Sequence, residues 1–122
     1  MMDIERIPHE FSICKVADYT MVDLARPFHF TGGTDREKSL VCPTDCVPAN
    51  ALVRNDGWRA FRVAGTLDFS LIGILARISG LLAEAGIGIF AVSTYDTDYI
   101  LTKSENYNRA LEALAGDGWR IV

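Results

Sequence analysis

The chain has 122 residues, of which 49% are hydrophobic and 23% are charged, and its formal net charge is −4. This length and composition are typical of a compact domain with its own hydrophobic core, which excludes a disordered chain or a disulfide-dependent scaffold. The 12 Lys and Arg residues are scattered, so we expect no basic face for nucleic acid or for a membrane surface. Three cysteines and an N-terminus without an apolar run predict a reduced, cytoplasmic protein.

The first half of the chain is predicted to form short strands and little helix. Strands are expected at residues 10–16, 28–31 and 39–42. Residues 17–27 are too few for a full crossover helix and predict a turn or two. Residues 44–53 predict a short second helix that Pro48 weakens.

The second half begins with a strand and continues into an amphipathic helix. Residues 58–67 predict a strand that serves both as the last strand of the first half and as the first strand of the second. In residues 71–86 the apolar positions are three and four apart, which predicts one broad helical face ended by Gly86. Residues 87–94 and 98–103 predict two strands of a hairpin, joined by a turn at residues 95–97.

A second helix and a final strand complete the predicted order. Ser104 is predicted to cap the helix, with Glu105 beside its positive end. The apolar face consists of Tyr107, Ala110, Leu111 and Leu114. Residues 116–118 end this helix, and residues 119–122 predict a strand. The order β-α-β-β-α-β predicts an α+β, ferredoxin-like fold, in which both helices cover one face of an antiparallel sheet.

The sequence also contains an internal similarity. The string Asp-Gly-Trp-Arg at residues 56–59 recurs at residues 117–120, a displacement of 61 residues. The same displacement aligns Asp35 with Asp96 and Leu40 with Leu101, whereas Phe11 aligns with Phe61 at 50 residues. These matches predict a tandem duplication, with a reduced repeat at residues 1–59 and a complete one at residues 60–122. Chance similarity is the alternative.

Several segments resemble the ACT domain family. Residues 67–76, where an Asp shortly precedes a Gly at the start of the first helix, resemble the opening of an ACT domain. Residues 81–89 resemble the end of the ACT helix and its second strand. The string Ser-Thr-Tyr-Asp-Thr-Asp-Tyr-Ile-Leu at residues 93–101 is similar to the hairpin of the tandem-ACT subgroup that includes the CASTOR arginine sensors. The first half departs from the family pattern because it lacks the first helix and its leading Gly.

The resemblance implies a non-catalytic, regulatory ACT domain that binds a free amino acid without a cofactor or metal. Kinship points to arginine as the ligand, and the family implies a homodimer and an unidentified regulated protein as partners. The resemblance places ligand contacts in the strand-to-helix loop and in the hairpin that faces it. The implied ligand-binding residues are Asp68, Leu71, Ile72, Gly73, Thr94, Tyr95 and Asp98.

The residue types at these positions suit a zwitterion. Free N–H groups at a helix N-terminus bind a carboxylate, and Gly73 lets a ligand approach that backbone closely. Asp98 or Asp68 could accept hydrogen bonds from the ligand's ammonium group. Each residue also has a structural alternative: Asp68 as a helix cap, Gly73 in helix–sheet packing, Asp98 as a solvated turn residue, Tyr95 and Thr94 as hairpin residues.

Other chemistry is not expected from this sequence. Cys42 and Cys46 are separated by three residues, unlike a redox pair, and only His9 and His29 could complete a zinc site. No hydrolase or nucleotide-binding motif is present, so we expect no enzyme. Phe90 and Tyr99 lie among acids rather than basic residues, which argues against RNA. The main alternative to amino-acid binding is a structural or protein-interaction ACT-like module without a ligand.

Overall fold

The computed structural model describes residues 3–64 and 73–122. The chain forms two compact units, one made of Met1–Pro8 with Arg59–Val122 and the other of His9–Trp58. We call these the larger and the smaller unit. Two strands, β1 (Asp3–Val16) and β4 (Ala51–Val63), contribute residues to both units.

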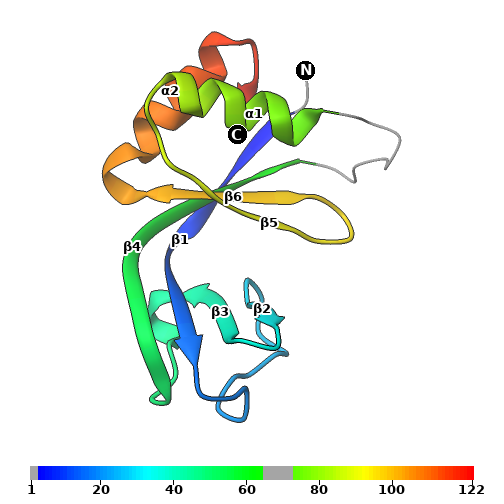
Figure 1. The fold of residues 1–122 in the computed structure, drawn as a ribbon. Helices are drawn as coiled ribbons and strands as arrows, with labels where there is room; N and C mark the ends of the chain where they lie inside the picture. Colours follow the sequence, from blue (N-terminus) through cyan, green and yellow to red (C-terminus); the bar gives the residue numbers. More distant parts are fainter. Residues whose placement is uncertain (1–2, 65–72) are drawn as a thin grey trace. The chain divides into compact units, whose positions relative to one another are not determined.

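The larger unit contains both α-helices and the second hairpin (Figure 1). After β4 come the following elements: α1 (Ile74–Glu84), β5 (Phe90–Ser93), β6 (Asp98–Lys103), the 3-10 turn η2 (Ser104–Asn106), α2 (Tyr107–Gly116) and β7 (Arg120–Ile121). Its strand order is β7-β1-β4-β6-β5. The β5–β6 pair is antiparallel, and the predicted ferredoxin-like arrangement is present with the start of β1 as an additional strand.

The additional strand runs beside β7. Asp3 and Ile4 pair in parallel with Arg120 and Ile121, and Arg120 Nη2 donates to Asp3 Oδ2 at 2.6 Å. The prediction placed the first strand only at residues 10–16, so its first seven residues were missed. The predicted antiparallel sheet therefore includes one parallel pair.

Both helices cover the same face of this sheet (Figure 1), and the core lies between the two layers. The apolar spacing of three and four residues buries Ile78 and Leu82 of α1. The fully buried strand residues against them include Phe61, Val63 and Ile100. Burying one such side chain contributes about 1.5–3 kcal/mol, so this interface is a main source of the unit's stability. The predicted α+β fold with two helices is confirmed.

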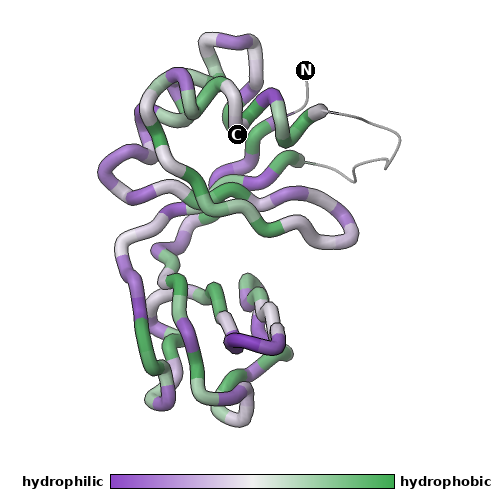
Figure 2. Tube along the Cα trace, in the orientation of Figure 1, coloured by the Kyte–Doolittle hydropathy of each residue, from purple (hydrophilic) through white to green (hydrophobic). Residues whose placement is uncertain are grey.

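The smaller unit consists of strands and one short helical turn. Besides β1 and β4 it contains β2 (Phe30–Gly33), β3 (Lys38–Pro43) and the 3-10 turn η1 (Thr44–Cys46), in the strand order β2-β3-β1-β4. Its hydrophobic core is small, and the buried residues of this core are Cys14, Val16, Leu40 and Cys42. The turn between β2 and β3 is strongly hydrophilic (Figure 2). No α-helix forms in the described residues of this unit, which matches its reduced sequence.

The two hairpins repeat each other with an identical register. Phe30 pairs with Val41 in the first hairpin, and Phe90 pairs with Leu101 in the second, a displacement of 60 residues. The turns η1 and η2 are also 60 residues apart. The predicted alignment of the hairpins at 61 residues is therefore wrong by one residue. The displacement becomes 61 at Gly57 and Gly118, which both have positive φ, of 86° and 96°, so the displacement changes from 60 to 61 between η2 and Gly118.

Several predicted element ends differ from the structure by one to three residues, among them those of β2, β3, α1, β5 and β7. Three further differences have a structural reason or a larger extent. Ser104 does not cap a helix; it begins η2, and its Oγ is buried without a hydrogen-bond partner among the described residues. The predicted helix at residues 44–53 is only η1, because Pro48 interrupts it and β4 begins at Ala51. The shared strand begins seven residues earlier than predicted, and residues 65–67 of the prediction lie outside the described residues.

No helix in residues 3–64 and 73–122 combines the length and the hydrophobicity needed to cross a lipid bilayer.

Candidate functional site

The predicted site begins in the loop between β4 and α1. Asp68, Leu71 and Ile72 lie outside the described residues, whereas Gly73 is the N-cap of α1. Gly73 has φ of 85°, a left-handed conformation that side chains disfavour, and its carbonyl accepts the Arg77 N–H at 2.8 Å. A Cβ at this position would meet no described atom within 4 Å. Gly73 therefore meets a backbone requirement, and the space beside it is open toward the described residues.

The hairpin turn holds the other predicted residues. Thr94 N–H donates to Thr97 O at 2.9 Å, and Thr94 Oγ1 donates to the same carbonyl at 3.0 Å. Tyr95 at the tip is 80% exposed. Ser93 Oγ donates to Asp98 Oδ1 at 2.6 Å, which orients that carboxylate beside the turn. The Thr94 hydroxyl thus closes the turn, whereas the Tyr95 side chain is largely exposed at its tip.

The smaller unit closes its hairpin in the same way. Thr34 N–H donates to Glu37 O at 2.9 Å, and Thr34 Oγ1 accepts the Glu37 N–H at 3.1 Å. Thr34 and Thr94 are 60 residues apart, in agreement with the strand register. The turn geometry is therefore a repeated structural feature of both hairpins.

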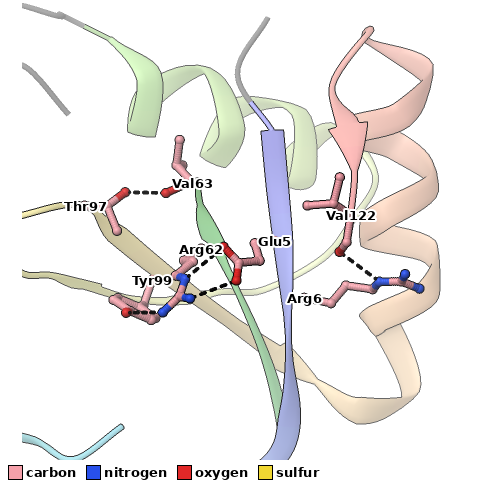
Figure 3. Close-up of polar contacts among 7 residues, drawn as sticks. All are labelled: Glu5, Arg6, Arg62, Val63, Thr97, Tyr99 and Val122. Carbon is pink, nitrogen blue, oxygen red and sulfur yellow. Dashed lines mark hydrogen bonds and ion pairs between the residues drawn. The ribbon is translucent and has the colours of Figure 1, made fainter. Parts of the chain in front are cut away.

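A buried hydrogen bond joins the hairpin to the end of β4. Thr97 Oγ1 donates to the Val63 carbonyl at 2.7 Å (Figure 3). Thr97 is 6% exposed and Val63 is fully buried, so solvent does not compete for this contact. Val63 is the last residue of β4. The hairpin turn and the start of the strand-to-helix loop are consequently neighbours.

A polar cluster that sequence reasoning missed lies on three strands of the larger unit. Arg62 of β4 donates to Glu5 Oε1 at 2.8 Å and to the Tyr99 hydroxyl at 2.9 Å (Figure 3). Phe61 and Val63 point into the core, so Arg62 points to the opposite face of the sheet. The Arg62 hydrogen bond holds the pKa of Glu5 below its usual range. The sequence signal for this cluster was an Arg in the middle of a predicted strand. Its partners, Glu5 and Tyr99, are far from it in the sequence, although their strands flank β4 in the sheet.

A second ion pair connects the first turn of α1 to the C-terminal end of α2. Arg77 Nε donates to Asp117 Oδ2 at 2.9 Å, and Arg77 Nη2 donates to Oδ1 at 3.2 Å. These hydrogen bonds lower the pKa of Asp117. Asp117 belongs to the second copy of the Asp-Gly-Trp-Arg string, at residues 117–120, and through this residue the string helps to hold α1 against the end of α2.

The three cysteines are free thiols, and two of them, Cys14 and Cys42, are buried. Burial raises the pKa of the Cys42 thiol to about 12, so it stays protonated at neutral pH. Residues 3–64 and 73–122 contain no group of three or more His, Cys, Asp or Glu side chains arranged to hold a metal ion.

Comparison with known proteins identifies the family. A model of the ACT domain family matches residues 53–116. The cytosolic arginine sensor for mTORC1 subunit 1 of Bos taurus is 31% identical over 81 residues, which cover 66% of this chain and 24% of that protein. The chain thus spans about a quarter of the length of the curated relatives it matches.

Two solved structures show the extent of the likeness. A structural-genomics protein of Agobacterium tumefaciens has a TM-score of 0.87 and 28% identity, and covers 99% of this chain and 92% of its own. The aspartate kinase of Clostridium acetobutylicum has a TM-score of 0.65 at 10% identity, covers 92% of this chain and 32% of its own, and shows the fold alone. Because the family match covers just over half of the chain, and the fold agrees with it, this protein belongs to the ACT domain family and is related to the arginine sensors.

Proposed function

We propose that this chain is a non-catalytic regulatory domain that binds a free amino acid. ACT domains are in general small-molecule regulatory domains, and the relative from Bos taurus is named as an arginine sensor. The observation that carries the proposal is the hydrogen bond from Thr97 Oγ1 to the Val63 carbonyl. It holds the acidic hairpin beside the start of the loop that ends at Gly73.

The ligand's carboxylate would bind the first N–H groups of α1. The described residues leave room beside Gly73 for a ligand against the backbone, where the helix dipole contributes about 0.3–1 kcal/mol. The ammonium would be held by Asp98 or Asp68, while Leu71, Ile72 and Tyr95 would form the walls and Thr94 would shape the turn. A ligand of about ten heavy atoms at roughly −0.5 kcal/mol each would bind with a Kd of ~100 μM.

We further propose arginine as the first ligand to test, because the sequence relative is an arginine sensor. The chain would act in the cytoplasm as a homodimer that regulates another protein. Light scattering in solution measures the mass, and a particle of one chain at micromolar concentration would contradict the dimer.

The proposed tandem duplication accounts for the repeated features of the two units. The order β2-β3-β1-β4 of the smaller unit is the ferredoxin-like order, with β4 in the place of the last strand. The common hairpin register, the Thr-closed turns and the positive φ of Gly57 and Gly118 support it. The reduced repeat would be residues 1–59 and the complete repeat residues 60–122.

A thermal-shift screen with the twenty amino acids tests the ligand proposal. At 10 mM, a ligand with a Kd of ~100 μM should stabilise the folded state by ~2.7 kcal/mol. Gly73→Val should abolish the ligand-induced shift, and Asp98→Asn should reduce it, while Asp96→Asn, a change at an exposed neighbour in the same turn, should not. The absence of a shift with all twenty would contradict amino-acid binding and favour a structural or protein-interaction module.

A further inference from the structure

The smaller unit contains a cavity of about 100 Å³ that none of the predicted ligand residues lines. Its wall includes His9 of β1, the loop residues Arg26, Phe28 and His29, and Asp45 of η1. A cavity of roughly 150 Å³ accommodates benzene, so this one accommodates a smaller organic molecule.

The wall of the cavity has an aromatic part with an unusual backbone. The Phe28 ring lies 5.5 Å from the His9 ring and 6.3 Å from the Phe11 ring, measured between centroids. Phe28 has φ of 60°, a left-handed conformation that is rare for a bulky residue. Residues held in such conformations cluster at ligand-binding positions, because the surrounding contacts must compensate for the strain.

The polar part of the wall consists of the Arg26 guanidinium, the imidazoles of His9 and His29, and the Asp45 carboxylate. Arg26 and His9 are exposed, and neither side chain makes a hydrogen bond or ion pair with another described residue. His29 Nδ1 lies 2.9 Å from the Pro27 carbonyl, and when Nδ1–H donates to that carbonyl the Nε2 of the neutral ring carries no proton and accepts a hydrogen bond. The carboxylate in the wall, Asp45, has a long contact of 3.7 Å with Cys46 Sγ. A planar anion would satisfy the donors of Arg26 and His9, and a guanidinium matches a carboxylate in two parallel hydrogen bonds.

We propose that this cavity binds a short-chain monocarboxylate of the size of acetate or propionate. Arg26 pairs with the carboxylate, a ring N–H of His9 contributes a further hydrogen bond, and the Phe28 ring covers the alkyl group. The site uses no residue of the proposed amino-acid site, so either proposal can fail without the other.

An NMR titration tests the proposal with acetate as the probe. Sodium acetate replaces sodium chloride at constant ionic strength up to 50 mM, and the amide signals of residues 26–29, 45 and 46 are followed. With four heavy atoms in the ligand, saturation with a Kd of ~1 mM is expected. Acetamide, which has the same shape without the charge, should bind at least tenfold more weakly.

A matched pair of variants assigns the effect to the cavity. Arg26→Gln should weaken acetate binding at least tenfold. Arg36→Gln, at an exposed Arg in the turn between β2 and β3, should leave it unchanged. Shifts that do not saturate, an equal response to acetamide, or unchanged binding by Arg26→Gln would each overturn the proposal.

Discussion

Two glycines of the first helical segment have opposite backbone requirements. Gly73 has φ of 85°, whereas Gly80 lies within α1, where φ is negative. A Cβ at either position would meet no described atom within 4 Å, so conformation rather than crowding decides the effect of a substitution. Comparing the two positions therefore distinguishes a glycine that is required by its positive φ from a glycine in a helical conformation that other residues also adopt.

Alanine at these positions should change stability in opposite directions. Gly73→Ala should lower the free energy of unfolding by about 1–2 kcal/mol, because an L-residue resists the left-handed conformation. Gly80→Ala should raise it by about 0.5–1 kcal/mol, since alanine favours the helix and restricts the unfolded chain. Urea unfolding followed by circular dichroism measures both values. Equal signs would show that Gly73 does not need its positive φ.

At the scale of elements, the cluster of Glu5, Arg62 and Tyr99 connects β1, β4 and β6. The side chain of Glu5 is 40% exposed, so solvent screens its ion pair and limits its contribution. The pKa of Glu5 is lower in the folded protein than its ordinary value of 4.5. A lowered carboxyl pKa contributes stability that is present above the unfolded pKa and is lost as the pH falls through the folded pKa.

The pH dependence of unfolding should therefore change in Glu5→Gln. Compared with the wild type, the variant should be less stable at neutral pH, and the difference should shrink as the pH falls below about 4.5. Glu10→Gln, at an exposed acid of the same strand, is the control and should change the profile less. Urea unfolding at a series of pH values measures the effect. A difference between wild type and Glu5→Gln that is constant over pH would exclude the ion pair as its cause.

The local sequence pattern predicted most helices and strands, but it did not predict which strands pair with one another. The apolar spacing around Ile78 and Leu82 predicted α1, and the turn at residues 95–97 predicted a hairpin partner at residues 98–103, the observed ends of β6. The start of β1 was missed because Ile4 and Ile7 do not alternate, and its partner Ile121 lies at the other end of the chain. The Arg62 cluster was also missed because its partners are remote in the sequence, and only the pairing of the strands brings these side chains together.

The candidate site could be predicted only as a set of positions. The hairpin string identified Thr94, Tyr95 and Asp98, but not that the Thr94 hydroxyl is engaged by Thr97 within the turn. Nor did it indicate that Thr97 anchors the turn to Val63, since this contact depends on the packing of β6 beside β4. The acetate-sized cavity had no sequence signal, because Phe28 resembles an ordinary strand residue.

At the scale of the whole molecule, both boundaries between the units fall inside strands. Pro8 and His9 lie within β1, and Trp58 and Arg59 lie within β4. Proteases cut extended, exposed segments far faster than hydrogen-bonded strands. The two units are thus connected by continuous β-strands rather than by irregular linkers.

Limited trypsin digestion should leave the bond after Arg59 intact while the turn between β2 and β3 is cut. The first cleavage should follow Arg36, which is exposed in that turn. Mass spectrometry of the early products measures the order. Arg36→Gln should slow the first cut without creating one at Arg59, and early fragments that end at Arg59 would contradict the continuity of β4.

The strand β4 also restricts which changes in length the protein tolerates. Deleting one residue between Ala51 and Phe61 would turn the following side chains to the other face of the sheet, exposing Phe61 and Val63 and directing Arg62 into the apolar layer. We therefore expect changes in length to be tolerated in turns and at helix ends rather than within this strand. Under the proposed duplication, the step from 60 to 61 residues between η2 and Gly118 would be one such change, located where a helix ends.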